Sequence, residues 1–201
     1  MKYITAFIFA VSIVTMSCAQ SYKKTINEYR EEYKKSFMND DRSPLKKEDV
    51  QYMRFFSPDK KYMVNAQFIK TQLAYPFDMS TFDGQKRKYI EYGTLVFDLI
   101  GKKYTLRVYQ NLSMMSSPDH QDLLFLPFTD MTNDKETYGG GRYLDFHIKD
   151  IQENILKLDF NKAYNPYCAY SSEYSCPKPP EENNLKVAIK AGEKKFAKES
   201  H

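Results

Sequence analysis

The sequence predicts a mainly β protein, either an antiparallel β-sandwich or an open barrel, with an N-terminal amphipathic helix and a long C-terminal loop. Short segments of alternating apolar and polar residues recur from residue 62 onward, as in strands with one face in a core. Turn residues separate these segments, which favours antiparallel strands over βαβ units. Seventeen Tyr and fourteen Phe without Trp indicate an aromatic core.

The chain begins with the features of a secretory signal. Lys2 is the only charged residue before position 23, and residues 3–17 form an uninterrupted run of apolar and small residues. A run of this length is too short to span a bilayer comfortably, but it suits the apolar core of a signal peptide. We therefore expect a signal peptide over residues 1–17, with an uncleaved anchor helix as a less favoured alternative.

The residues at the end of this run, Thr15-Met-Ser-Cys18, resemble a lipobox, although position 15 is usually aliphatic. In a lipobox the cysteine is diacylated and becomes the new N-terminus, and two or more acyl chains anchor a protein stably on a membrane. We expect lipidation at Cys18, a tether over residues 18–24, and an envelope lipoprotein that faces the periplasm or the exterior. A plain signal peptide cut nearby is the alternative.

The rest of the chain predicts one β-rich domain over residues 25–195. It is long enough for a full core, and no Ser/Gly/Pro-rich linker divides it. The formal net charge of the whole chain is only +4, and the excess lysines gather near the C-terminus. Residues 196–201 are therefore expected to form a solvated basic tail, and no nucleic-acid partner is predicted.

A helix is expected over residues 22–38, because large apolar and aromatic residues recur there at spacings of four and three: Tyr22, Ile26, Tyr29, Tyr33 and Phe37. Lys, Glu and Arg fill most of the other positions. Packing of the tyrosine face on the domain is favoured over a membrane-surface or partner-binding helix.

After a helical turn around residues 45–49, the chain alternates in the manner of strands, first over residues 62–68. The clearest hairpin joins residues 94–99 to residues 103–109 across Ile100-Gly101-Lys102, where Gly101 can take a positive φ. Further strands are predicted over residues 123–128, 142–147, 154–160 and 185–190.

No P-loop, dinucleotide GxGxxG, HExxH, GxSxG or CxxC pattern occurs, which excludes the common nucleotide-binding, zinc-protease and serine-hydrolase classes. We expect no cofactor and no metal. Polar residues gather late in the chain instead, in five blocks: residues 124–132, 136–145, 158–170, 175–185 and 189–194.

In order and spacing these blocks resemble a bacterial family catalogued as domain of unknown function 1684, over about residues 25–195. The family has no established activity, so the resemblance implies a fold and a set of motif residues but no reaction. The motif residues carried over are Phe128, Asp130, Thr132, Glu136, Thr137, Tyr138, Gly141, Arg142, Tyr143, Asp159, Asn161, Tyr164, Asn165, Pro166, Cys168, Cys176, Pro177, Pro180, Asn183 and Gly192.

With Cys18 assigned to lipid, Cys168 and Cys176 remain as an even pair in an oxidising compartment. A disulfide between them would close the C-terminal loop and stabilise the fold by about 2.6 kcal/mol in the chain-entropy model. Free buried thiols or a metal-binding pair are the alternatives. The nearest histidine is His147, so a zinc site with four ligands has little support.

The Gly139-Gly-Gly141 turn allows a close backbone approach, and the guanidinium of Arg142 directly after it offers a planar fork of donors. Such a turn suits a small anionic or sugar ligand. The candidate binding residues are Asp130, Glu136, Tyr138, Arg142, Asp159, Asn161 and Asn165. The favoured alternative is that these side chains bond backbone groups of the long loop over residues 161–184 and fix its shape.

Four tyrosines of that loop can either stack on a sugar or aromatic ligand or hold the loop on the strands: Tyr164, Tyr167, Tyr170 and Tyr174. The sequence thus predicts a ligand-binding or structural envelope lipoprotein, and a role other than catalysis is favoured. The competing hypothesis is a hydrolase that uses Asp130, Glu136 or Asp159 as general acid or base.

Overall fold

The structure of the protein is a computed structural model that covers residues 2–198, with side chains from Gln20 onward. The predicted lipidation site, the side chain of Cys18, therefore lies outside the described residues, as does the end of the predicted tail. Among the described residues, no helix combines the length and apolar character needed to cross a membrane.

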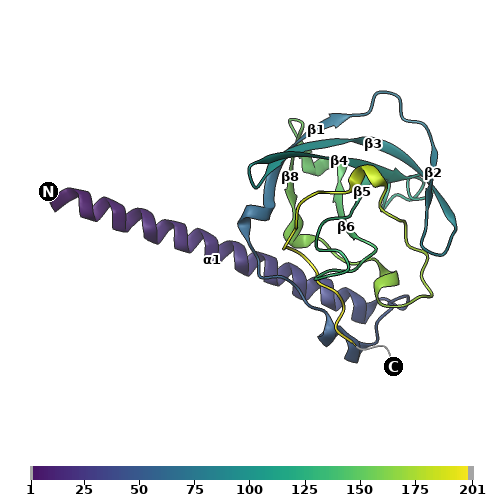
Figure 1. Cartoon of the computed structure of the whole chain (residues 1–201), viewed down its shortest axis with the longest axis horizontal. Coiled ribbons are helices and arrows are strands. Elements are labelled where there is room, and N and C mark those ends of the chain that lie inside the picture. The colour runs from purple at the N-terminus through teal and green to yellow at the C-terminus, as the bar shows by residue number, and fades with distance from the viewer. Residues whose placement is uncertain (1, 199–201) are drawn as a thin grey trace.

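Over residues 2–198, the fold consists of one long helix and one sheet, joined by loops and short 3-10 helices (Figure 1). The helix α1 (Lys2–Asn39) contains the segment predicted to be helical. Short 3-10 helices punctuate the rest: η1 (Lys47–Tyr52), η2 (Lys60–Tyr62), η3 (Ile148–Asp150), η4 (Phe160–Lys162), η5 (Tyr167–Ala169) and η6 (Glu181–Asn183).

The eight strands of the described residues belong to one antiparallel sheet in the order β6-β5-β4-β3-β1-β8-β7, with β2 also paired to β3. Within the described chain, β6 and β7 end this order without pairing to each other, so the sheet is open. The mainly β, antiparallel prediction is confirmed. The strands are β1 (Met63–Lys70), β2 (Phe77–Ser80), β3 (Lys86–Leu99), β4 (Lys102–Asn111), β5 (Leu123–Phe128), β6 (Arg142–His147), β7 (Ile151–Gln152) and β8 (Ile155–Asp159).

The predicted hairpin is the pair β3 and β4, with a shorter turn than expected. Leu99 pairs with Lys102, which leaves Ile100 and Gly101 as a two-residue turn. Both have positive φ, 51° and 73°, the geometry of a type I′ turn that matches strand twist. Glycine adopts it freely, whereas the exposed Ile100 is a β-branched residue in an unfavourable region.

The structure reproduces the strands predicted over residues 123–128 and 142–147, and it places β8 inside the segment predicted over residues 154–160. The strand predicted over residues 185–190 was wrong, because that segment forms no strand. The carbonyl groups of Ile189 and Ala191 accept hydrogen bonds from a side chain, that of Arg142, and not from a strand neighbour.

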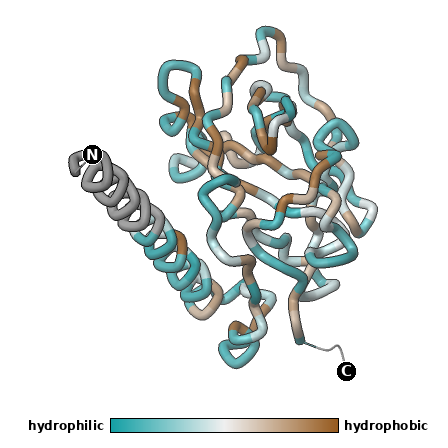
Figure 2. The backbone as a smooth tube through the Cα atoms, turned by 60° about the vertical axis from the view of Figure 1, so that its left-hand side comes forward, coloured by the Kyte–Doolittle hydropathy of each residue, from teal (hydrophilic) through white to brown (hydrophobic). Residues whose placement is uncertain are grey.

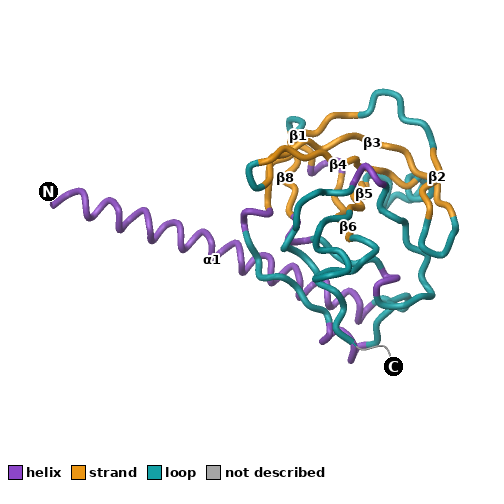
Figure 3. Tube along the Cα trace, viewed as in Figure 1, coloured by secondary structure: helices purple, strands orange, loops and turns teal. Residues whose placement is uncertain are grey.

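The core lies against one face of the sheet. A single cluster of buried side chains draws on β1, β3, β4, β5, β6 and β8 and includes Phe160 of η4 and Leu185 and Ile189 from the loops. Apolar stretches follow the strands through the middle of the domain, and the surrounding loops are more hydrophilic (Figure 2). A second cluster joins Phe37 of α1 to Val50 and Met53. Long loops fill the space between the sheet and α1 (Figure 3).

Candidate functional site

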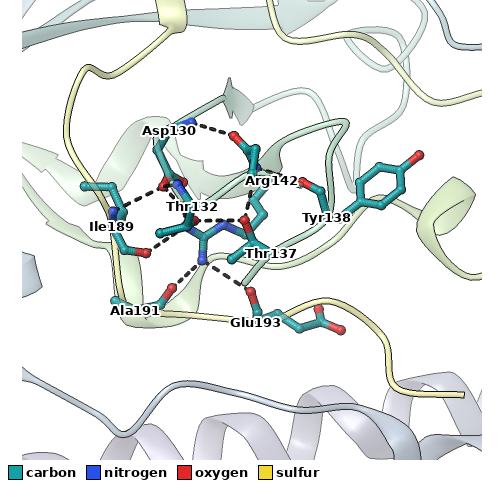
Figure 4. Close-up of polar contacts among 9 residues, drawn as sticks. Asp130, Thr132, Thr137, Tyr138, Arg142, Ile189, Ala191 and Glu193 are labelled. Atoms are coloured by element: carbon teal, nitrogen blue, oxygen red, sulfur yellow. Dashed lines mark hydrogen bonds and ion pairs between the residues drawn. The ribbon is translucent and has the colours of Figure 1, made fainter. Parts of the chain in front are cut away.

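Arg142, the residue proposed to bind an anion, lies at the centre of a buried cluster (Figure 4). Its side chain is 0% exposed, and its Nη2 donates to Asp130 Oδ2 at 2.7 Å and to the carbonyl of Ile189 at 2.9 Å. Its Nη1 donates to the carbonyls of Ala191 and, at 3.2 Å, Glu193. The fork of donors is therefore occupied by the chain itself.

The other oxygen of Asp130 completes this cluster. Asp130 Oδ1 accepts from the backbone and hydroxyl of Thr132, at 2.8 and 2.6 Å, and from the backbone N–H of Ile189 at 3.2 Å. The hydroxyl of Thr132 lies 2.8 Å from that of Thr137. These bonds fix the turn after β5 to the segment that follows the long loop.

Burial lowers the pKa of Arg142, and the neighbouring Asp130 carboxylate opposes the shift. Only the Nε–H of the guanidinium lacks a partner among the described residues, and solvent does not reach it. The expected anion site at the turn before Arg142 is therefore corrected: the geometry is that of the alternative, an anchor for the loop.

Asp159 and Asn161 form a second anchor, which fastens α1 to the end of β8. The hydroxyl of Tyr22 in α1 donates to the Asp159 carboxylate at 2.9 Å and accepts from Asn161 Nδ2 at 2.8 Å. Asn161 Oδ1 accepts from the backbone N–H of Asp59 at 2.9 Å, and its Nδ2 donates back to the Asp59 carbonyl, also at 2.9 Å.

The remaining candidates are also spread apart. The backbone N–H of Asn165 donates to buried Glu193 at 2.9 Å, whereas Glu136 pairs with Lys190 at the surface at 3.1 Å. The hydroxyl of Tyr138 lies 3.7 Å from the sulfur of Cys168. The carboxylates suggested for hydrolysis thus sit in three different settings: Asp130 and Asp159 in separate anchors, and Glu136 in a surface ion pair.

A pocket of about 500 Å³ lies elsewhere, where α1, the strands β3 to β6 and the 161–184 loop meet. Eight of its lining residues are aromatic, among them Tyr29, Tyr33, Phe125, Tyr143, Tyr164 and Tyr174. The pocket therefore gathers three of the four loop tyrosines that the sequence offered for stacking and two tyrosines from the predicted helix face.

Among the described residues, the only carboxyl group on this pocket's wall is that of Asp145 in β6. Because side chains alternate along a strand, Leu144 and Phe146 point into the core, and Tyr143 and Asp145 point to the pocket side. Tyr164 donates its hydroxyl to Asp145 Oδ2 at 2.5 Å.

Asp145 is enclosed by surrounding protein, but its side chain reaches solvent through the pocket. Desolvation raises the pKa of Asp145 to about 6, against the opposing effects of the Tyr164 hydrogen bond and of His147. A perturbed carboxyl group in a concave pocket is typical of functional sites. Asp145 is absent from the candidates that the sequence suggested, although its position two residues after Tyr143 in a predicted strand placed both on one face.

Of the two cysteines, Cys176 lines the same pocket. Cys168 and Cys176 are free thiols in this structure, so the predicted disulfide is not found. The sulfur of buried Cys176 instead accepts from the backbone N–H of Cys168 at 3.1 Å. Interaction with Cys176 lowers the pKa of Cys168 to about 7 and raises that of Cys176.

Fold and site together define a class: a mainly β domain with an open antiparallel sheet, one long helix and an aromatic pocket where helix, sheet and loop meet. The chain belongs to the family described as "Protein of unknown function (DUF1684)", whose model matches residues 48–194. The family resemblance seen in the motif blocks is thereby confirmed.

Among solved structures, the chain is similar to an uncharacterised protein of Haloarcula marismortui determined by solution NMR. The two are 32% identical with a TM-score of 0.67, and the match covers 89% of this chain and 96% of that chain. No curated protein matches the sequence.

Proposed function

We propose that this protein is a small-molecule-binding domain and that the pocket at Asp145 is its binding site. The observation that carries the proposal is the aromatic pocket of about 500 Å³ with one solvent-reachable carboxyl group in its wall. Its volume falls within the range of about 300–1,000 Å³ typical of ligand sites, which are mostly apolar with a few polar groups. A purely structural subunit would not need such a pocket.

The ligand chemistry follows from the walls of the pocket. Tyrosine rings offer apolar faces, and their hydroxyls offer hydrogen bonds, which suits a compact organic molecule such as a sugar. An anionic ligand has less support here, because an ionised Asp145 would repel it. The hydrolase alternative has less support as well, because Asp130, Glu136 and Asp159 do not share a pocket.

A blocked pocket should lose its ligands. Met114 and Met115 are exposed neighbours, 43% and 40% accessible, but only Met114 lines the pocket. We expect compounds from a metabolite and glycan library to raise the melting temperature of the wild type. The affinity of those compounds should fall at least tenfold in Met114→Trp and stay unchanged in Met115→Trp. A library without any stabilising compound, or equal affinities in both variants, contradicts a binding pocket.

We further propose that the domain is carried on the envelope as a lipoprotein acylated at Cys18. Support comes from the uncharged run before that cysteine and the small residue directly ahead of it. Full-length protein should partition into the detergent phase of a cell extract, and Cys18→Ser should partition into the aqueous phase. Partitioning of both the wild type and Cys18→Ser into the aqueous phase would rule out the lipid anchor.

We also propose that Cys168 and Cys176 are joined in an oxidising compartment. Their contact at 3.1 Å, backbone nitrogen to sulfur, supports the pairing. Oxidation would close the loop and stabilise the fold by about 2.6 kcal/mol. Peptide mapping under non-reducing conditions should recover one linked peptide from envelope-derived protein. Recovery of two freely alkylated thiols would refute the disulfide.

A further inference from the structure

We propose that the pocket at Asp145 is built for a small organic cation, namely an alkylammonium or quaternary ammonium group, with Asp145 as its counter-ion. This inference rests on the proposed function, since it names the ligand class of the same pocket. Three features of the pocket lead to it: the arrangement of its rings, a cation already seated at its edge, and the single carboxyl group.

The rings form walls at right angles to one another. The ring of Tyr143 is nearly perpendicular to that of Phe125, with centroids 4.8 Å apart at 77°, and to that of Tyr164, at 5.9 Å and 89°. Tyr167 and Tyr174 are likewise perpendicular, with ring centroids 5.3 Å apart. The face of an aromatic ring carries negative charge density that attracts cations, and cages of several such faces are how proteins recognise quaternary ammonium groups.

A protein cation already lies over another ring of the pocket, that of Tyr29. The ammonium of Lys162 lies 5.2 Å from the ring centroid of Tyr29, and both residues line the pocket. This distance is within the roughly 6 Å over which a cation is attracted to a ring face. The Lys162 side chain is exposed, so solvent screens its repulsion of a second cation deeper in the pocket.

Asp145 supplies the complementary charge. Its Oδ2 accepts from Tyr164, and its Oδ1 has no hydrogen-bond partner among the described residues. The other titratable groups around it are Lys162 beside the pocket, His147 on the same strand, Tyr29 of α1 and Tyr89 of β3. His147 is itself paired with Asp122 at 3.0 Å. Within the described chain, Asp145 is thus the one carboxylate that a ligand in the pocket can reach.

Acid should release the cation. The pKa of Asp145 is raised to about 6 by desolvation, so the group is ionised at pH 7.5 and mostly neutral at pH 5. Desolvation raises the pKa of Tyr29 to about 12, so its hydroxyl keeps its proton throughout this range. Loss of the Asp145 charge would remove the ion pair and leave the aromatic walls unchanged.

The test compares choline with 3,3-dimethyl-1-butanol, which has the same shape but carries carbon in place of the charged nitrogen. We expect the full chain, titrated by NMR, to bind choline at least tenfold more tightly than the alcohol at pH 7.5. That preference should disappear at pH 5 and in Asp145→Asn, which keeps an acceptor for Tyr164. Asp122→Asn should retain it, since Asp122 does not line the pocket.

Equal affinities for the two probes, or choline binding that survives in Asp145→Asn, would overturn the cation inference and leave a neutral-ligand pocket in place. Absence of binding by both probes overturns it too, and the library screen with Met114→Trp then decides separately whether the pocket binds anything. If Asp145→Asn melts below the wild type, the comparison of wild-type affinities at pH 7.5 and pH 5 tests the same ion pair without a variant.

Discussion

Replacement of Arg142 by alanine is expected to destabilise the fold by about 3–5 kcal/mol, because it leaves a buried charge without a partner. The carboxylate of Asp130 would lose its 2.7 Å ion pair in a place where both side chains are 0% exposed. The carbonyls of Ile189, Ala191 and Glu193 would lose their donors in the same step.

Arg142→Lys should fall between the wild type and Arg142→Ala. Lysine keeps the positive charge, but its single ammonium cannot reproduce the planar fork that reaches Asp130 and three carbonyl groups. The loss should therefore be smaller than in Arg142→Ala and still measurable. Both values would come from urea denaturation of the wild type and the two variants.

Arg107→Ala is a matched control on the same sheet. Arg107 pairs with Glu91 at 2.7 Å, but its side chain is 46% exposed, and surface pairs contribute only about 0–1 kcal/mol. A loss of less than about 1 kcal/mol in Arg142→Ala, similar to that of Arg107→Ala, would show that the buried cluster does not anchor the loop.

The sequence predicted best those elements whose signal is local. Residues 123–128 form a short continuous apolar run, and residues 142–147 are rich in aromatic and apolar residues, so both indicate short strands from local composition alone. The segment 185–190 is also rich in aliphatic residues, but the carbonyl of its Ile189 accepts from the side chain of Arg142, 47 residues earlier in the chain. No local pattern contains that information.

The candidate site shows the same limit more sharply. An arginine after three glycines has the same sequence pattern whether its guanidinium donates to a ligand or to backbone carbonyls. The difference depends on whether the side chain is buried, and burial is a property of the whole fold. The pocket was not predicted as a unit because its walls come from α1, several strands and the long loop. Its polar group, Asp145, could have been noticed from strand alternation with Tyr143, but nothing local shows that this face is concave.

Raising the pH from about 4.5 to 8 should lower the free energy of unfolding, with Glu193 as the main cause. Glu193 is 0% exposed, and desolvation raises its pKa from 4.5 to about 7. Hydrogen bonds from Tyr170 and from the Asn165 backbone, at 2.5 and 2.9 Å, and the nearby charge of Arg142 oppose that shift without cancelling it.

The direction follows from which state binds the proton more tightly. Below pH 4.5 Glu193 is protonated in both states, and its favourable contribution is complete. Between pH 4.5 and 7 the unfolded chain releases this proton while the folded protein keeps it, so stability falls as the pH rises. Each unit of difference between the folded and unfolded pKa of Glu193 corresponds to about 1.4 kcal/mol, so the total loss of stability is about 3 kcal/mol.

Glu193→Gln isolates this effect from that of Asp145, whose raised pKa of about 6 adds a slope of the same sign. Glutamine cannot ionise, so the free energy of unfolding, measured by urea denaturation from pH 4.5 to 8, should depend less on pH in the variant. The stability of the variant relative to the wild type should therefore increase as the pH rises. Glu136→Gln, at an exposed ion pair, should run parallel to the wild type. If the free energies of unfolding of Glu193→Gln and the wild type change with pH in parallel, Glu193 is not a buried neutral acid. It would then already be ionised in the folded protein at low pH, with Arg142 and Tyr170 stabilising the anion.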